Sequence, residues 1–239
     1  MLLRTDEFAG LTVRITGGSD GRGGGDGPLV VLLHGFGAPG DDLVPLAPLF
    51  GLPRAVRFAF PAAPLELPGL YGDSRAWWMI DLERLERDLA SGSERDLSGD
   101  EPAGLAEVRD ALAAAIAEIE EELGAPPART VFGGFSQGSM LATDLALRGD
   151  RPLAGLLLWS GTLLAADAWR ALAPRRTGLP VFMSHGRQDA LLPFAAAERL
   201  RDLLAGAGLP VDWVEFRGGH EIPPAALRGA AAFLARLLG

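Results

Sequence analysis

The chain has 239 residues, 48% of them hydrophobic, and it contains neither cysteine nor lysine. Disulfides, thiolate metal sites, a cysteine nucleophile and lysine Schiff-base chemistry are therefore excluded. The formal net charge of −9 opposes nonspecific binding to nucleic acid or to an anionic membrane surface.

The length and apolar content favour one packed domain that spans residues 1–239. No apolar run approaches the length of a membrane span, so we expect no stable membrane insertion. The first seven residues turn acidic at once and lack the basic and apolar regions of a secretory signal. We therefore expect a cytoplasmic protein.

Short apolar runs alternate with helical patterns along most of the chain. Residues 11–15 alternate between polar and apolar side chains, which predicts an antiparallel edge strand. Several later runs are continuously apolar, which is typical of a parallel sheet covered on both faces. The predicted strands are 29–33, 55–60, 130–132, 153–159, 180–184 and 211–216, and the predicted helices are 103–123, 140–148, 194–204 and 223–238. This alternation predicts an α/β fold, doubly wound around a mostly parallel sheet.

Two segments interrupt this alternation. Residues 17–27 are rich in glycine but lead into a strand, which favours a flexible turn between strands over a phosphate-binding loop. Residues 61–102 form a long, lid-like segment rich in proline and glycine. We expect this segment to be irregular with short helices and to fold over the carboxyl edge of the sheet, where ligands bind in open α/β sheets.

The pentapeptide Gly134-Phe135-Ser136-Gln137-Gly138 lies between a predicted strand and a predicted helix. In this setting a G-x-S-x-G sequence forms a strained turn that exposes a serine oxygen to substrate. The turn needs small flanking residues, which the glycines supply. Ser136 is therefore the candidate nucleophile. Ser160 also follows a predicted strand, but it lacks this setting, so we interpret it as a strand-end cap.

A serine hydroxyl is a weak nucleophile at neutral pH and needs a general base that is oriented by an acid. His220 lies after the last predicted strand, in a loop whose glycines allow it to bend back toward the serine. Asp189 follows the predicted strand 180–184, at the expected carboxyl edge of the sheet. The order Ser136, Asp189, His220 is the order in which α/β-hydrolases carry their catalytic residues. A helix N-cap is the alternative role for Asp189.

Other residues compete for the acid and base roles. Asp150 follows a helix rather than a strand, and Glu221 is too close to His220 in sequence to reach its far ring nitrogen easily. His34 and His185 each lie at the end of a predicted strand, and we interpret both as buried hydrogen-bonding residues. The spacing of the three histidines fits no common zinc site, so we expect no metal.

An oxyanion hole needs two backbone N–H groups. The residue after the nucleophile, Gln137, supplies one candidate. The loop that begins His34-Gly35-Phe36-Gly37 supplies the other, with Phe36 as the donor, because its glycines permit close approach of a substrate oxygen. The candidate substrate-contacting residues are Trp77, Trp78, Leu70 and Leu191. The two tryptophans could line an acyl pocket or anchor the long segment, since aromatic residues serve both uses.

Several sequence blocks together resemble the phospholipase/carboxylesterase family of α/β-hydrolases, which contains the acyl-protein thioesterases. The blocks extend over nearly the whole chain and are 33–37, 74–78, 134–139, 160–161, 185–189 and 219–220. The resemblance implies an α/β-hydrolase fold with Ser136 as nucleophile, Asp189 as acid and His220 as base. It also implies Phe36 and Gln137 as oxyanion donors. The family often has leucine in place of Phe36, and residues 88–104 are longer and more polar than expected.

Three functions are compatible with these residues. We expect a serine carboxylesterase that hydrolyses esters of short to medium acyl chains through a covalent acyl-enzyme. The first alternative is a lysophospholipase or acyl-protein thioesterase with longer-chain substrates, and the second is a non-catalytic binding module. The expected partner is a small-molecule or lipid ester. No cofactor and no nucleic acid are expected, and a homodimer is compatible with the sequence.

Overall fold

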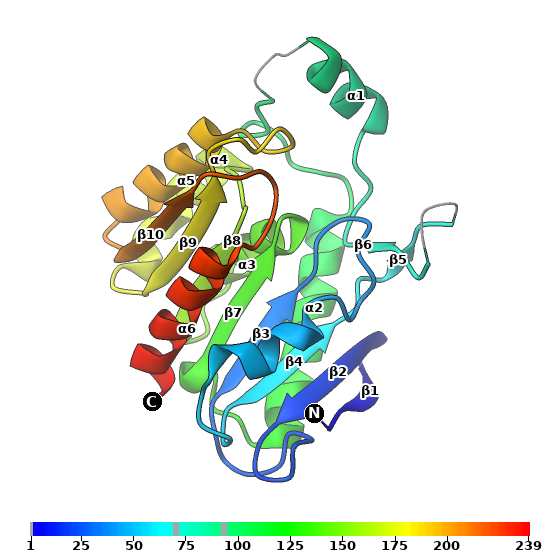
Figure 1. The fold of residues 1–239 in the computed structure, drawn as a ribbon, viewed down its shortest axis with the longest axis vertical. Helices are drawn as coiled ribbons and strands as arrows, with labels where there is room; N and C mark the ends of the chain where they lie inside the picture. The colour runs from blue at the N-terminus through cyan, green and yellow to red at the C-terminus, as the bar shows by residue number, and fades with distance from the viewer. Residues whose placement is uncertain (1, 69–71, 92–94) are drawn as a thin grey trace.

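A computed structural model gives the structure of residues 2–68, 72–91 and 95–239. Its centre is an eight-stranded sheet with the strand order β1-β2-β4-β3-β7-β8-β9-β10 (Figure 1). The parallel strands are β3 (Leu29–Leu33), β4 (Arg57–Pro61), β7 (Thr130–Phe135), β8 (Gly155–Trp159), β9 (Val181–Gly186) and β10 (Val211–Phe216). The predicted α/β fold with a mostly parallel sheet is confirmed.

Helices cover both faces of the sheet, which explains the continuously apolar strands. Every residue of β3, β4 and β8 is buried. One face is covered by α2 (Leu105–Leu123), α3 (Gln137–Arg148), α4 (Ala166–Leu172) and α5 (Phe194–Gly206), and the other by η1 (Val44–Phe50) and α6 (Pro224–Leu238). None of the described helices is long and apolar enough to cross a bilayer.

The four predicted helices are confirmed with small shifts at their ends, as α2, α3, α5 and α6. Helix α4 and the 3-10 helices η1, η2 (Pro127–Arg129) and η3 (Ala173–Arg176) were not predicted. These elements are too short to show a helical period in the sequence.

The prediction that residues 11–15 form an edge strand is wrong, although the strand itself is present and antiparallel. β2 (Leu11–Gly17) pairs with β4 on one side and with β1 (Arg4–Phe8) on the other, so β1 is the edge. The sequence of β1 contains two acidic residues, which strands usually avoid. Ala9 and Gly10 connect the two strands with φ of 45° and 77°, as a tight hairpin turn requires.

Both irregular segments occupy the expected places. Residues 17–27 connect β2 to β3 without a helix, and the Asp20 carboxylate accepts the backbone N–H groups of Arg22 and Gly24. Residues 61–102 include the short pair β5 (Leu65–Glu66) and β6 (Arg75–Ala76) and the helix α1 (Leu82–Ser91). Helix α1 lies beyond the carboxyl ends of the parallel strands (Figure 1).

Candidate active site

Ser136 occupies a strained turn between β7 and α3. Its backbone has φ 55° and ψ −117°, which is an unfavourable conformation for a residue with a side chain. A Cβ atom at Gly138 would overlap the backbone carbonyl of Leu33 at the end of β3, and a Cβ at Gly134 would lie 2.5 Å from the Gly138 carbonyl carbon. Only glycine fits at these two positions, as the sequence predicted.

Hydrogen bonds from the Ser136 backbone and from the Ser139 side chain stabilise this turn. The Ser136 N–H donates to the carbonyl of Trp159 at the end of β8. The buried Ser139 hydroxyl lies 2.7 Å from the Gly134 carbonyl oxygen and 2.9 Å from the Trp159 carbonyl oxygen. These bonds join the turn to the ends of β7 and β8.

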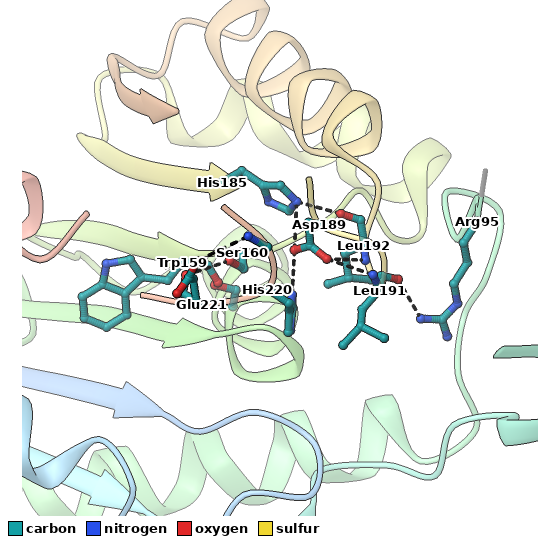
Figure 2. A network of polar contacts seen from close by, with 11 residues as sticks. Arg95, Trp159, Ser160, His185, Asp189, Leu191, Leu192, His220 and Glu221 are labelled. Carbon is teal, nitrogen blue, oxygen red and sulfur yellow. Dashed lines mark hydrogen bonds and ion pairs between the residues drawn. The ribbon is translucent and has the colours of Figure 1, made fainter. Parts of the chain in front are cut away.

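His220 and Asp189 form a hydrogen-bonded pair at the carboxyl edge of the sheet. His220 lies in the loop between β10 and α6, and Asp189 in the loop between β9 and α5. The His220 Nδ1 is 2.7 Å from the Asp189 Oδ2, and Figure 2 shows the two side chains facing each other. The competing acids lie elsewhere, since Asp150 is exposed and the Glu221 carboxylate accepts the Gly219 N–H at 3.3 Å.

The environment of Asp189 favours its ionised form. Burial acts to raise the pKa of this carboxyl, but the hydrogen bond from His220, the electrostatic attraction to that side chain and the Leu192 N–H hold the pKa below its ordinary value. The Asp189 Oδ1 accepts the N–H groups of Leu191 and Leu192, each at 2.9 Å. These bonds leave the Oδ2 directed at His220.

His185 is fully buried and lies beneath this pair. Its Nε2 is 2.7 Å from the Leu192 carbonyl oxygen and 3.3 Å from the Asp189 Oδ2, so this nitrogen carries the proton (Figure 2). Burial lowers the pKa of the His185 imidazole, which keeps the ring neutral. The prediction of a buried hydrogen-bonding histidine is confirmed, and its contact with Asp189 is a detail that the sequence did not reveal.

Ser136 and His220 line one cavity of about 660 Å³. The Phe135 ring lies 4.7 Å from the His220 imidazole, which brings the base next to the serine turn. Within the described residues, the Ser136 hydroxyl makes no hydrogen bond with His220. Catalytic hydrogen bonds in unliganded sites are often long and shorten only when substrate binds. The candidate base and acid are thus already hydrogen-bonded, and Ser136 lines the same cavity as His220.

The two candidate oxyanion donors also line this cavity. Gln137 is the first residue of α3, where helix N–H groups lack partners within the helix. Phe36 lies in the loop after β3. In the part of the chain that the structure describes, neither backbone N–H is used in a hydrogen bond. Both groups are therefore free to bind a substrate oxygen.

His34 holds the loop that carries Phe36. Its Nδ1 lies 2.8 Å from the Gly35 carbonyl oxygen, and its Nε2 accepts the N–H of Ala63 at 2.9 Å, so the proton is on Nδ1. The His34 carbonyl oxygen accepts the indole N–H of Trp77 at 2.9 Å. Both ring nitrogens are occupied, and the prediction of a structural role for His34 is confirmed.

The Gln137 side chain joins the serine turn to residues 77 and 78, and the sequence analysis did not identify this contact. Its Oε1 accepts the Trp77 N–H at 2.9 Å, and its Nε2 donates to the Trp78 carbonyl oxygen at 2.8 Å. The one signal in the sequence that could have indicated this contact is the amide side chain directly after Ser136, at a position where the turn is expected to be buried. Gln137 is 2% exposed, and a buried amide requires partners.

Two of the four predicted substrate-contacting residues line the cavity. Trp78 and Leu191 line the cavity. Trp77 is not among the lining residues and is buried at 1% exposure, where it anchors residues 74–78 to His34 and Gln137. Leu70 lies outside the described residues. The described part of the chain holds no group of three or more histidine, aspartate or glutamate side chains arranged for a metal ion.

Comparison with known proteins assigns the chain to a family. Residues 25–238 match the family model described as phospholipase/carboxylesterase. The chain belongs to this family of ester hydrolases. The family resemblance that the sequence predicted is confirmed. The α/β-hydrolase fold is confirmed with it, because the structure of esterase PE8 has a TM-score of 0.78 and 28% identity over the whole of both chains.

Curated relatives cover most of the chain. Acyl-protein thioesterase 1 of Emericella nidulans is 29% identical over 220 residues, which are 87% of this chain and 90% of that protein. A probable carboxylesterase of Oryza sativa subsp. japonica is 30% identical over 200 residues, which are 81% of this chain and 71% of that protein.

The burial of His34 predicts that its imidazole does not titrate near neutral pH. Burial lowers its pKa to about 4, although the bond to the Gly35 carbonyl acts in the opposite direction. We expect nitrogen-15 NMR spectra of histidine-labelled protein to show a neutral Nδ1–H ring between about pH 5 and 8, where free histidine changes charge. The His34→Gln variant assigns the signal, and a midpoint near the ordinary histidine value would contradict this structure.

Proposed function

We propose that this protein is a serine carboxylesterase that hydrolyses carboxylic esters of short to medium acyl chains. The observation that carries the proposal is the 2.7 Å bond from the buried Asp189 to His220, which lines the same cavity as the strained Ser136 turn. Membership of the phospholipase/carboxylesterase family supports the same reaction. A cytoplasmic location remains a prediction from the sequence.

In the proposed reaction, the Ser136 hydroxyl oxygen attacks the ester carbonyl carbon while the His220 Nε2 accepts its proton. The His220 Nδ1–H stays bonded to the ionised Asp189, which stabilises the imidazolium. The N–H groups of Phe36 and Gln137 bind the negative charge that develops on the carbonyl oxygen. His220 then donates its proton to the leaving alcohol, and the acyl group remains on Ser136.

Hydrolysis of the acyl-enzyme repeats these steps with water. His220 takes a proton from the attacking water, the same two N–H groups stabilise the second tetrahedral intermediate, and the proton returns to the Ser136 oxygen as the acid departs. Asp189 keeps the imidazole in one tautomer through both halves of the reaction. The low pKa of Asp189 supports this role, because a neutral carboxyl would not stabilise the imidazolium.

A thioesterase is the second candidate, and one specific observation favours it. The curated relative with 90% coverage is named acyl-protein thioesterase 1. Thioesters would use the same nucleophile, base and oxyanion donors, with a thiolate as leaving group. The cavity of about 660 Å³ has apolar walls that include Leu85, Leu97 and Leu164, which suit an acyl chain in either case.

The Ser136→Ala variant tests the nucleophile. We expect it to lose turnover of p-nitrophenyl acetate on the order of 10³-fold or more, because no hydroxyl remains for His220 to activate. Ser160→Ala is the matched control, since Ser160 also follows a strand and has a positive φ of 46°. The control should keep most of its turnover. Near-normal turnover by Ser136→Ala, or an equal loss in Ser160→Ala, would contradict the assignment.

An acyl-chain series separates the carboxylesterase from the longer-chain alternatives. We expect kcat/KM for p-nitrophenyl esters from acetate to palmitate to be highest for short and medium chains and to fall for long ones. The physical reason is that charged side chains, among them Asp81, Arg84 and Arg95, interrupt the apolar wall against which a long chain would lie. Parallel measurements on thioesters of the same acids compare the leaving groups. A steady rise toward palmitate would favour a lysophospholipase or an acyl-protein thioesterase.

A further inference from the structure

Arg95 is a cation in the cavity of Ser136 and His220, and it has few partners there. It is half-buried and lies between α1 and α2. Its Nη1 lies 3.4 Å from the Leu191 carbonyl oxygen, at the long end of hydrogen bonding (Figure 2). Its Nε is buried without a hydrogen-bond partner among the described residues. Among the described residues, the guanidinium therefore has one acceptor, the Leu191 carbonyl oxygen.

Arg84, which lines the same cavity, provides a comparison. Its Nη1 lies 2.8 Å from the Asp100 Oδ2, and its Nη2 donates to the Asp96 carbonyl oxygen at 2.9 Å. Across residues 2–68, 72–91 and 95–239, Arg95 forms no such ion pair with a carboxylate. The two arginines thus line one cavity, and of the two only Arg84 has a carboxylate partner among the described residues.

Burying the Arg95 guanidinium, with its Nε unpartnered among the described residues, costs free energy when no ligand is bound. Burial lowers the pKa of the guanidinium and nearby Arg84 lowers it further, while Asp88, Asp100 and Asp81 oppose this. Arginine stays charged at any accessible pH, so the cost of burying it persists. A carboxylate or phosphate could accept two parallel N–H groups of the guanidinium, and such charge-assisted bonds are about twice as strong as neutral ones.

Four described carboxylates line the cavity, but none of them pairs with the Arg95 guanidinium. They are Asp42, Asp81, Asp100 and Glu101. Asp100 pairs with Arg84, and Glu101 lies 2.7 Å from Arg148. Asp81 accepts the backbone N–H of Arg84 at the start of α1. Asp42 belongs to the segment after β3, and burial raises its pKa to about 6, which weakens its charge.

We propose that Arg95 binds an anionic group of the substrate, so that this site prefers esters that also carry a carboxylate or a phosphate. The inference deepens the proposed function and rests on it, because the same cavity holds the reacting ester. Leu97 and Leu191 line the cavity with Arg95, and apolar surroundings strengthen an ion pair by excluding water.

Matched substrates that differ in one charge test the inference. The acetate esters of β-hydroxypropionate and β-hydroxypropionamide place the charge on the alcohol. Monoethyl succinate and ethyl succinamate place it on the acyl group. The acetate ester of ethylene glycol monophosphate, compared with its dimethyl phosphate counterpart, tests a phosphate. The kcat/KM of each ester is measured by titrating the released acid at constant pH.

We expect the protein to hydrolyse the charged member of at least one pair faster, and the responding pair identifies where the anion lies. Arg95→Met should lower the charged-to-neutral ratio of kcat/KM by about 10- to 100-fold, since a charge-assisted bond is lost. Arg95→Lys keeps the charge without the planar fork and should give an intermediate ratio. Arg87→Met is the control, because Arg87 is exposed on α1 and does not line the cavity.

Two results would overturn the inference. One is a charged-to-neutral ratio of kcat/KM at or below one for every substrate pair in the unmodified protein. The other is an Arg95→Met variant that slows both members of a pair equally, which would make Arg95 a structural contact of Leu191 only. Failure to hydrolyse any ester, neutral ones included, would instead contradict the proposed function, and the inference would fall with it.

Discussion

The close approach of β3, β7 and the start of α3 is the constraint on which the rest of the site depends. Gly138 lies against the Leu33 carbonyl with no space for a side chain, and this contact forces Ser136 into a positive φ of 55°. Such a conformation costs roughly 1–3 kcal/mol and persists only where the surrounding structure fixes it. Here the fully buried strands β3 and β8 and the bonds of Ser139 do so. The same approach brings the loop after β3 and the first residue of α3 to the wall of one cavity.

The substrate side of the site is attached to this core by polar contacts rather than by apolar packing alone. Gln137 binds the backbone of both Trp77 and Trp78, and the indole of Trp77 binds His34. The Ser136 turn, the loop after β3 and residues 74–78 are therefore one hydrogen-bonded unit. The lining residues between 79 and 102 lie outside this unit and carry most of the charged groups of the cavity, Arg84 and Arg95 among them. The residues proposed to catalyse hydrolysis are therefore separate from Arg95, which is proposed to select the substrate.

Much of this arrangement could be predicted from sequence because parallel strands end at one edge of a sheet. A serine, an acid and a histidine that each follow a strand must meet there, and the 2.7 Å bond between His220 and Asp189 agrees with that reasoning. Other features had no local signal. The edge strand β1 contains Asp6 and Glu7, and the Gln137 contacts join residues about sixty positions apart. The lack of a carboxylate partner for Arg95 among the described residues depends on how residues 61–102 fold, which no period in that segment encodes.

The most direct test of the central claim is to locate the residue that reacts with a fluorophosphonate. The claim is that the strained turn and the adjacent base make Ser136 the single activated serine of the chain. Trypsin cleaves after Arg129 and Arg148, which places Ser136 on the peptide 130–148 and Ser160 on the peptide 149–170. Fragmentation mass spectrometry should find one adduct, on Ser136, and His220→Ala should abolish it. An adduct on Ser160 or Ser139, or no adduct in the unmodified protein, would contradict the account.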